Sequence, residues 1–92
     1  MSAPCRRTLR IVNRKGLHAR ASAKFVSTVE AHDASARVSH DGIEVSGDSI
    51  MGLLTLAAAQ GSEIEVEASG PEAEALLDAL EALVADYFGE GG

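Results

Sequence analysis

The chain has 92 residues, of which 46% are hydrophobic and 24% charged, and this suits one small globular domain with a single modest core. No stretch approaches the roughly 18 apolar residues that a membrane span needs, and the N-terminus lacks the apolar run of a secretory signal. Two Phe, one Tyr and no Trp offer no platform for stacking bases, and the single Cys5 can form neither an internal disulfide nor a cysteine metal cluster. We therefore expect a cytoplasmic protein that forms one domain over residues 1–92, inserts into no membrane and binds no nucleic acid.

The formal net charge of −6 conceals an asymmetry along the chain. Seven of the eight basic residues lie at or before Lys24, and all fourteen acidic residues lie from Glu30 onward. If folding preserves this separation, a basic region surrounds His18 and suits an anion and an acidic partner surface. Arg6 and Arg7 are interpreted as solvated residues of a frayed start that covers residues 1–7.

Alternating and 3.6-residue hydrophobic periodicities predict four strands and three helices. The dipeptide Asp41-Gly42 is typical of a type I′ turn and predicts an antiparallel hairpin. Gln60-Gly61 marks the end of the second helix, and residues 89–92 are expected to fray. The predicted elements are, in chain order, a strand over residues 8–12, a helix over 19–30, strands over 34–39 and 43–46, a helix over 50–59, a strand over 63–67 and a helix over 72–88. This βαββαβα order fits an α+β fold with helices on one face of a mainly antiparallel sheet.

The segment Gly16-Leu17-His18-Ala19-Arg20 places an imidazole and a guanidinium at the start of the first predicted helix. The backbone N–H groups there have no intrahelical partner and lie at the positive end of the helix dipole, so the position favours anions. His18 can act as a nucleophile, and Arg20 can pair with the negative charge that arrives. The structural alternative is an exposed histidine beside a helix cap.

Ser49 occupies a predicted N-cap position of the second helix, and capping alone explains a serine there. A phosphate on its hydroxyl would place about two negative charges beside Ile50, Met51 and Leu54, and this would switch off a docking surface. The other candidate site residues are interpreted as solvated surface residues. His32 and His40 lack metal-ligand spacing, and the acidic residues that alternate with Ile64 and Val66 are expected to face solvent, namely Glu63, Glu65 and Glu67.

Taken together, the segment Gly16-Leu17-His18-Ala19-Arg20, the segment Ser49-Ile50-Met51-Gly52 and the βαββαβα order resemble the HPr phosphocarrier family of the bacterial phosphotransferase system. The resemblance covers about residues 8–88, and two separate motifs at predicted helix starts make it far more specific than the first segment alone. It implies an open-faced sandwich in which a four-stranded antiparallel sheet is covered on one face by three helices.

By this resemblance, His18 would accept a phosphoryl group from phosphorylated Enzyme I and pass it to IIA proteins. Nδ1 of His18 would be the nucleophile, and Arg20 matches the family's phosphate-contacting arginine. Ser49 matches a regulatory serine, which a serine kinase and phosphorylase would modify. The chain would be a phosphohistidine intermediate rather than a stand-alone enzyme, a monomer that uses no metal and no other cofactor.

The same resemblance implies a convex docking patch with basic residues at its rim. Two positions depart from the family pattern: Ala21 replaces a frequent proline after the motif arginine, and Asp48 replaces a frequent lysine before the regulatory serine. Regulation at Ser49 is therefore a weaker inference than transfer at His18. The predicted patch consists of Leu17, Ala23, Ile50, Met51 and Leu54.

Three functional alternatives remain at this point. The carrier could serve a regulatory branch, in nitrogen or carbon signalling, rather than sugar uptake. The same surface could instead belong to a non-catalytic regulatory module, whose binding is independent of His18 chemistry. A small acyl-phosphate hydrolase is the third alternative, although no second polar side chain beside Arg20 is predicted to position water.

Overall fold

The computed structural model describes residues 4–90, and it contains the predicted elements in the predicted order. Alternating apolar residues form the strands, and the 3.6-residue stripes form the helices. A short 3-10 helix, η1 (Tyr87–Gly89), follows the last helix. The strands are β1 (Cys5–Arg10), β2 (Ser35–His40), β3 (Ile43–Ser46) and β4 (Glu63–Ser69), and the helices are α1 (Ala19–Glu30), α2 (Ile50–Leu56) and α3 (Ala73–Ala85).

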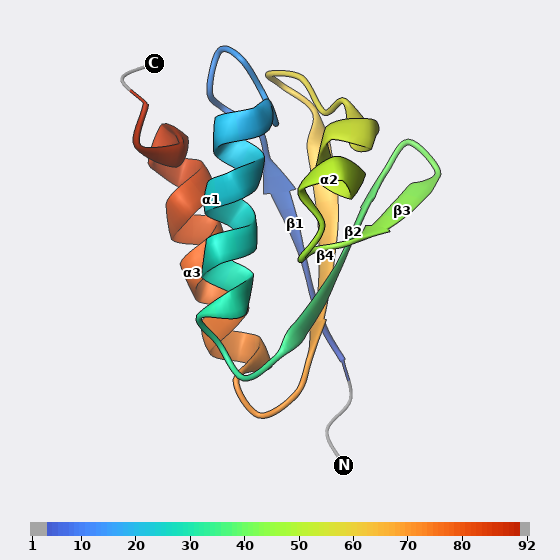
Figure 1. The fold of residues 1–92 in the computed structure, drawn as a ribbon, viewed down its shortest axis with the longest axis vertical. Helices are drawn as coiled ribbons and strands as arrows, with labels where there is room; N and C mark the ends of the chain where they lie inside the picture. Colours follow the sequence, from blue (N-terminus) through green and yellow to red (C-terminus); the bar gives the residue numbers. More distant parts are fainter. Residues whose placement is uncertain (1–3, 91–92) are drawn as a thin grey trace.

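The four strands form one sheet in the order β1-β4-β2-β3, and every neighbouring pair is antiparallel. Figure 1 shows α1 and α3 side by side across one face of this sheet, with α2 beside the β2–β3 hairpin. Ile64 and Val66 point into the core, while Glu63 and Glu65 are exposed on the opposite face. The predicted fold class, an open-faced α+β sandwich with three helices on one face of a four-stranded antiparallel sheet, is confirmed. No helix within residues 4–90 is long and apolar enough to cross a membrane.

The first strand begins earlier than the periodicity predicts. Cys5 pairs with Ala68 in β4, so the expectation of a frayed start is wrong for residues 5–7. Arg6 Nε donates to a carboxylate oxygen of Glu67 at 2.8 Å, and Arg7 is held by two carboxylates of α3. Both arginines therefore belong to the folded sheet rather than to a solvated tail. Of the predicted frayed ends, residues 1–3 and 91–92 lie outside the described residues.

Both later helices end sooner than predicted. Ala57 takes a left-handed conformation with φ of +51° and terminates α2 before Gln60-Gly61 is reached. After α3 the chain turns through positive φ at Tyr87 and Phe88, and the Phe88 ring is fully buried. Left-handed residues thus end α2 at Ala57 and turn the chain after α3 from Tyr87 to Gly89. In contrast, Asp41 and Gly42 both have positive φ, so the predicted type I′ turn is confirmed.

Candidate functional site

The loop before α1 is held rigidly against the segment that follows α2. Asn13 Nδ2 donates to the carbonyl oxygen of Gly16 at 2.8 Å, and Leu17 N–H donates to the carbonyl oxygen of Ala58 at 3.0 Å. Gly16 has a φ of +66°, and a Cβ at this position would overlap the Ala58 oxygen. The glycine therefore allows the backbones to approach closely enough to fix the start of α1.

His18 is the N-cap of α1, as the sequence predicts. Its Nδ1 accepts a hydrogen bond from the Arg20 backbone N–H at 3.3 Å. The first intrahelical bond runs from Ser22 N–H to the His18 carbonyl oxygen, so the amides of Ala19, Arg20 and Ala21 precede it without carbonyl partners in the helix. Nδ1 thus lies at the positive end of a twelve-residue helix whose first turn contains no acidic residue.

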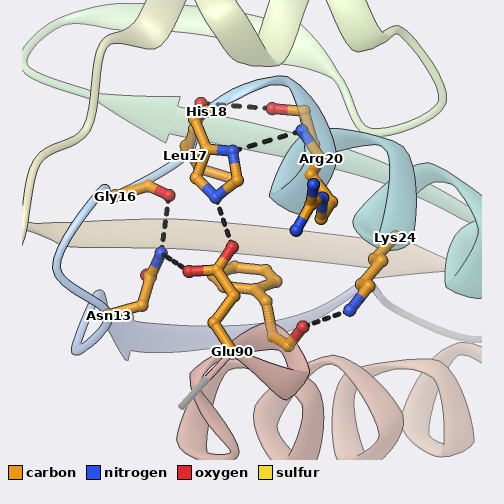
Figure 2. A network of polar contacts seen from close by, with 9 residues as sticks. Asn13, Gly16, Leu17, His18, Arg20, Lys24 and Glu90 are labelled. Carbon is orange, nitrogen blue, oxygen red and sulfur yellow. Dashed lines mark hydrogen bonds and ion pairs between the residues drawn. The ribbon is translucent and has the colours of Figure 1, made fainter. Parts of the chain in front are cut away.

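The other ring nitrogen of His18 faces a carboxylate from beyond α3 (Figure 2). His18 Nε2 contacts Glu90 Oε2, and Asn13 Nδ2 donates to Glu90 Oε1 at 3.0 Å. Desolvation of the Glu90 carboxyl group opposes its ionisation. Hydrogen bonds from His18 and Asn13 and the nearby charges of His18 and Lys15 outweigh this effect, and the pKa of Glu90 is lowered. His18 therefore has different partners on its two nitrogens: an amide donor at Nδ1 and a carboxylate acceptor at Nε2.

Basic residues surround this histidine in an open depression with a volume of about 440 Å³. The His18 side chain is 26% exposed, so a partner can reach it without the opening of a lid. The predicted basic region is therefore formed in space, from the loop before α1 and the exposed side of α1. Together with His18, Gly89 and Glu90, the residues that line the depression are Arg14, Lys15, Arg20 and Lys24.

Ser49 lies at the start of the neighbouring helix, as the sequence predicts. It is the N-cap of α2, and its Oγ accepts a hydrogen bond from Gly52 N–H at 3.0 Å. The adjacent Asp48 carboxylate accepts a hydrogen bond from Ser46 Oγ at 2.5 Å. No basic side chain pairs with either residue among the ion pairs of residues 4–90.

The predicted docking patch is only partly at the surface. Met51 and Ile50 are 74% and 39% exposed, and Leu54 and Ala23 are half-buried. Leu17 is only 4% exposed and belongs to the core, so the expectation that it forms part of an exposed patch is wrong. Its backbone N–H donates to the Ala58 carbonyl oxygen, and its side chain packs in the core.

Sequence reasoning missed two residues of the site. Glu90 was expected to lie in a frayed end, but it is half-buried against His18. Asn13 is not among the predicted site residues, yet its side chain is fully buried and joins Gly16 to Glu90. An asparagine between Val12 and a basic turn was a weak signal for a structural amide, whereas nothing near Glu90 in the sequence indicates its partner.

The other candidate residues lie away from this depression. His32 Nδ1 is hydrogen-bonded to the Thr28 carbonyl oxygen, and His40 Nδ1 to the Glu63 carbonyl oxygen. Neither histidine lines the depression around His18. Across residues 4–90, no group of three or more His, Cys, Asp or Glu side chains is arranged to hold a metal ion.

The arrangement around His18 is suited to receiving a group with negatively charged oxygens. Nδ1 has a lone pair because its only partner in the described structure is an N–H donor, and Nε2 carries the proton that faces Glu90. The Ala19 and Ala21 amides have no carbonyl partner within the helix, and the Arg20 side chain lies beside the His18 ring (Figure 2). These features together form a nucleophile beside a preorganised anion site.

Comparison with known proteins gives consistent matches over almost the whole chain. A family model described as the PTS HPr component phosphorylation site matches residues 5–86. The chain is 44% identical over 81 residues to phosphocarrier protein HPr of Cupriavidus necator, covering 88% of this chain and 91% of the relative. It is 38% identical over 86 residues to phosphocarrier protein NPr of Escherichia coli K12, covering 92% and 96%. The crystal structure of HPr-C-His from Thermoanaerobacter tengcongensis matches with a TM-score of 0.90 and 35% identity, over 96% of this chain and 99% of that one.

Proposed function

The chain belongs to the HPr family of phosphotransferase-system phosphocarriers, and from this premise we propose that His18 accepts a phosphoryl group from phosphorylated Enzyme I and passes it to IIA proteins. The observation that carries the proposal is the geometry at Nδ1. The lone pair of this atom accepts only a long hydrogen bond, from Arg20 N–H at 3.3 Å, and the atom lies at the N-terminus of α1 on a ring that is reachable from solvent.

In the proposed transfer, Nδ1 releases its hydrogen bond from Arg20 N–H, and its lone pair attacks the phosphorus atom of a phosphohistidine on Enzyme I. The new N–P bond forms as the donor's N–P bond breaks, and the electron pair of the broken bond stays on the donor ring. The first-turn amides of α1 and the Arg20 guanidinium then stabilise the phosphoryl oxygens. The same steps in reverse deliver the phosphoryl group to a histidine of an acceptor. A shallow site suits this role, because two different partners must reach the same nitrogen.

The surface around His18 supports partners with an acidic face and an apolar contact. The basic side chains that line the depression would be its rim, and exposed Ile50 and Met51 on α2 would supply the apolar contact.

All residues that line the depression belong to one chain, and we propose a monomeric carrier that acts with its partners in the cytoplasm. Light scattering after size-exclusion chromatography tests the monomer, and a dimer at micromolar concentration would contradict it.

Labelling with phosphoenolpyruvate and Enzyme I tests the transfer step. The wild-type chain should acquire an acid-labile, alkali-stable phosphate, whereas His18→Ala should acquire none. His32→Ala and His40→Ala are matched controls, because both histidines lie outside the depression, and each should label like the wild type. Absence of label on the wild type, or undiminished label on His18→Ala, contradicts the proposal. Release of inorganic phosphate from acetyl phosphate would indicate the hydrolase alternative.

The destination of the phosphoryl group is tested with purified IIA proteins. We propose IIA proteins of sugar uptake as acceptors, and a regulatory branch as the alternative, because the relatives include proteins named HPr and NPr. Labelled carrier is mixed with a sugar-uptake IIA protein or a regulatory IIA protein, and the rate of label transfer is compared. Transfer only to the regulatory protein would overturn the sugar-uptake proposal. Partner binding that is unaffected in His18→Ala, without any transfer, would indicate a non-catalytic regulatory module.

Ser49 is proposed as a regulatory phosphorylation site, modified by a serine kinase and restored by a phosphorylase. A phosphate there would lie beside the apolar patch formed by Ile50 and Met51 and near the Asp48 carboxylate. We expect the modified chain to accept phosphate from Enzyme I more slowly, because the apolar contact gains two negative charges. Equal rates for modified and unmodified chains would contradict this regulation, and Ser49→Ala is the control for labelling by the kinase.

A further inference from the structure

The segment after α3 brings a carboxylate to a histidine that lies 72 residues earlier in the chain. Glu90 follows η1, and its carboxylate lies between Asn13 and His18 in the depression (Figure 2). The side chain of Glu90 is only 16% exposed, although the preceding residue is exposed. A surface glutamate with no function would extend into water, so this placement requires an explanation.

Several independent contacts hold the segment in this position. The Phe88 ring is fully buried in the core, and Lys24 Nζ donates to the Phe88 carbonyl oxygen at 2.6 Å. Gly89 N–H and Glu90 N–H close the turn on Asp86 and Tyr87 at 2.9 Å each. The turn therefore fixes where the backbone of Glu90 lies, and the Asn13 amide fixes one oxygen of its carboxylate.

We propose that Glu90 is a positioning residue for phosphoryl transfer at His18, an inference that rests on the proposed carrier function. The carboxylate accepts the Nε2–H of the imidazole, which holds the ring in one orientation and keeps its proton away from the nucleophilic nitrogen. The Arg20 amide on the opposite side can only donate, so it selects the same tautomer. Two partners on opposite nitrogens thus keep the lone pair on Nδ1, and the long bond from the Arg20 amide is released when the phosphorus atom arrives.

The charge of Glu90 also matters during the reaction. When Nδ1 forms its bond to phosphorus, electron density leaves the ring, and the proton on Nε2 becomes more acidic. That proton remains on Nε2 throughout the transfer, and the adjacent carboxylate stabilises the positive charge that develops on the imidazole. Glu90 contacts Nε2, the nitrogen that does not form the bond to phosphorus, so it acts through His18.

Glu90→Ala, Glu90→Gln and Glu90→Asp separate position from charge. We expect Glu90→Ala to lower the maximal rate of His18 phosphorylation by roughly tenfold, the lower range for loss of one charge-assisted hydrogen bond, because the site is partly solvated. The carrier concentration that gives half the maximal rate should change by less than about twofold. Glu90→Gln keeps an acceptor without the charge and should be intermediate, whereas Glu90→Asp should recover part of the loss. Asp86→Asn removes an exposed carboxylate from the same turn and is the matched control.

Nitrogen-15 NMR of His18 provides a readout that does not depend on Enzyme I. In the wild type at neutral pH, we expect the Nε2-protonated tautomer and an Nε2–H proton protected from rapid exchange with water. Glu90→Ala should lose this protection, while Asp86→Asn should keep it. A merely structural role of the segment would change stability without changing the tautomer signal or the maximal rate.

Each result has a distinct meaning. Wild-type chain that does not label would overturn the carrier function itself, whereas wild-type labelling with an equally fast Glu90→Ala variant would overturn only the positioning role. A faster Glu90→Ala variant would also overturn it, and would mean that the carboxylate obstructs the site. An Nε2–H proton that exchanges equally fast in both chains would contradict the proposed contact in solution.

Discussion

Two helix N-termini in this molecule are capped by side chains that can carry a phosphoryl group, and they differ in what surrounds the cap. His18 caps α1 and Ser49 caps α2, and each side chain accepts a hydrogen bond from a backbone amide of its own first turn. His18 lies in a basic depression with a carboxylate behind its far nitrogen. Ser49 lies beside the acidic Asp48 and the exposed apolar residues at the start of α2.

This difference indicates that a helix start alone does not make a carrier site. Both caps lie at the positive end of a helix and accept a backbone N–H of its first turn, so these features cannot distinguish them. The surrounding charges distinguish the two caps. A phosphoryl group at His18 would lie near Arg20 and the neighbouring lysines, whereas one at Ser49 would lie next to a carboxylate on the preceding residue. We therefore interpret α1 as the transfer site and α2 as the docking helix.

The largest expected effect concerns the glycines that precede the two caps by two residues. Gly16→Ala combines a strained positive φ with overlap of the Ala58 carbonyl, and should lower the free energy of unfolding by about 3 kcal/mol. Gly47→Ala has no positive φ, and its Cβ would lie 2.9 Å from the Ala36 Cβ, so about 1 to 2 kcal/mol is expected. Urea unfolding with an unchanged m-value measures both. Equal losses of unfolding free energy would mean that close backbone packing fixes the two helix starts to the same degree.

The next effect tests the electrostatic side of the comparison. Arg20→Ala should slow His18 phosphorylation by roughly tenfold, because one cation that stabilises the phosphoryl oxygens is lost. Arg37→Ala removes an exposed arginine that pairs with Glu44 on the β2–β3 hairpin, and it is the matched control for net charge. Initial labelling rates with Enzyme I measure the effect. Similar rates for the two variants would show that long-range charge, rather than the position of Arg20, governs transfer.

Much of this fold follows from local sequence pattern. The helix over residues 19–30 and the strand over residues 43–46 have the predicted bounds, because their periodicity and flanking turn residues agree with the tertiary packing. The ends of α2 and α3 do not, since Ala57 and Phe88 adopt left-handed conformations that residues other than glycine rarely take. Local propensity does not indicate such turns. It also places the start of the first strand at residue 8 rather than at Cys5, because Cys5 to Arg7 pair with β4, far away in the sequence.

The candidate site, like the fold, was predictable only where local sequence signals determine the position of a residue. His18, Arg20 and Ser49 lie at helix starts with recognisable glycine and cap signals, so their positions could be derived from spacing. Glu90 could not, because its role depends on a turn that follows a buried phenylalanine and on an amide 77 residues away. Leu17 was misplaced as well, because its side chain packs in the core although its position in the motif indicated a surface residue.

A smaller effect separates the capping role of Ser49 from its proposed regulatory role. Ser49→Ala should lower the free energy of unfolding by about 1 kcal/mol, because Gly52 N–H loses its side-chain acceptor. Ser49→Asp retains a cap and should be nearly as stable as the wild type, yet it should slow labelling by Enzyme I, because a charge is added beside Met51. Thermal unfolding and labelling rates are measured on both variants. Slow labelling of Ser49→Ala as well would mean that the cap, not the charge, controls the docking helix.

The smallest expected effect is a pH dependence of stability that arises from Glu90, which contacts Nε2 of His18. The pKa of Glu90 lies below its ordinary value in the folded chain, so its ionised form stabilises the fold above the unfolded pKa, and this contribution is lost as pH falls through the folded pKa. Wild type should therefore be slightly more stable than Glu90→Gln at pH 7, and the difference should disappear on acidification below about pH 4. Urea unfolding of both chains at several pH values measures it. A difference that persists after Glu90 is protonated would contradict the contact, because a neutral carboxyl group no longer attracts the His18 ring more strongly than an amide does. This pH dependence distinguishes the two helix starts, because of the two N-cap side chains only that of His18 contacts a carboxylate from a distant segment of the chain.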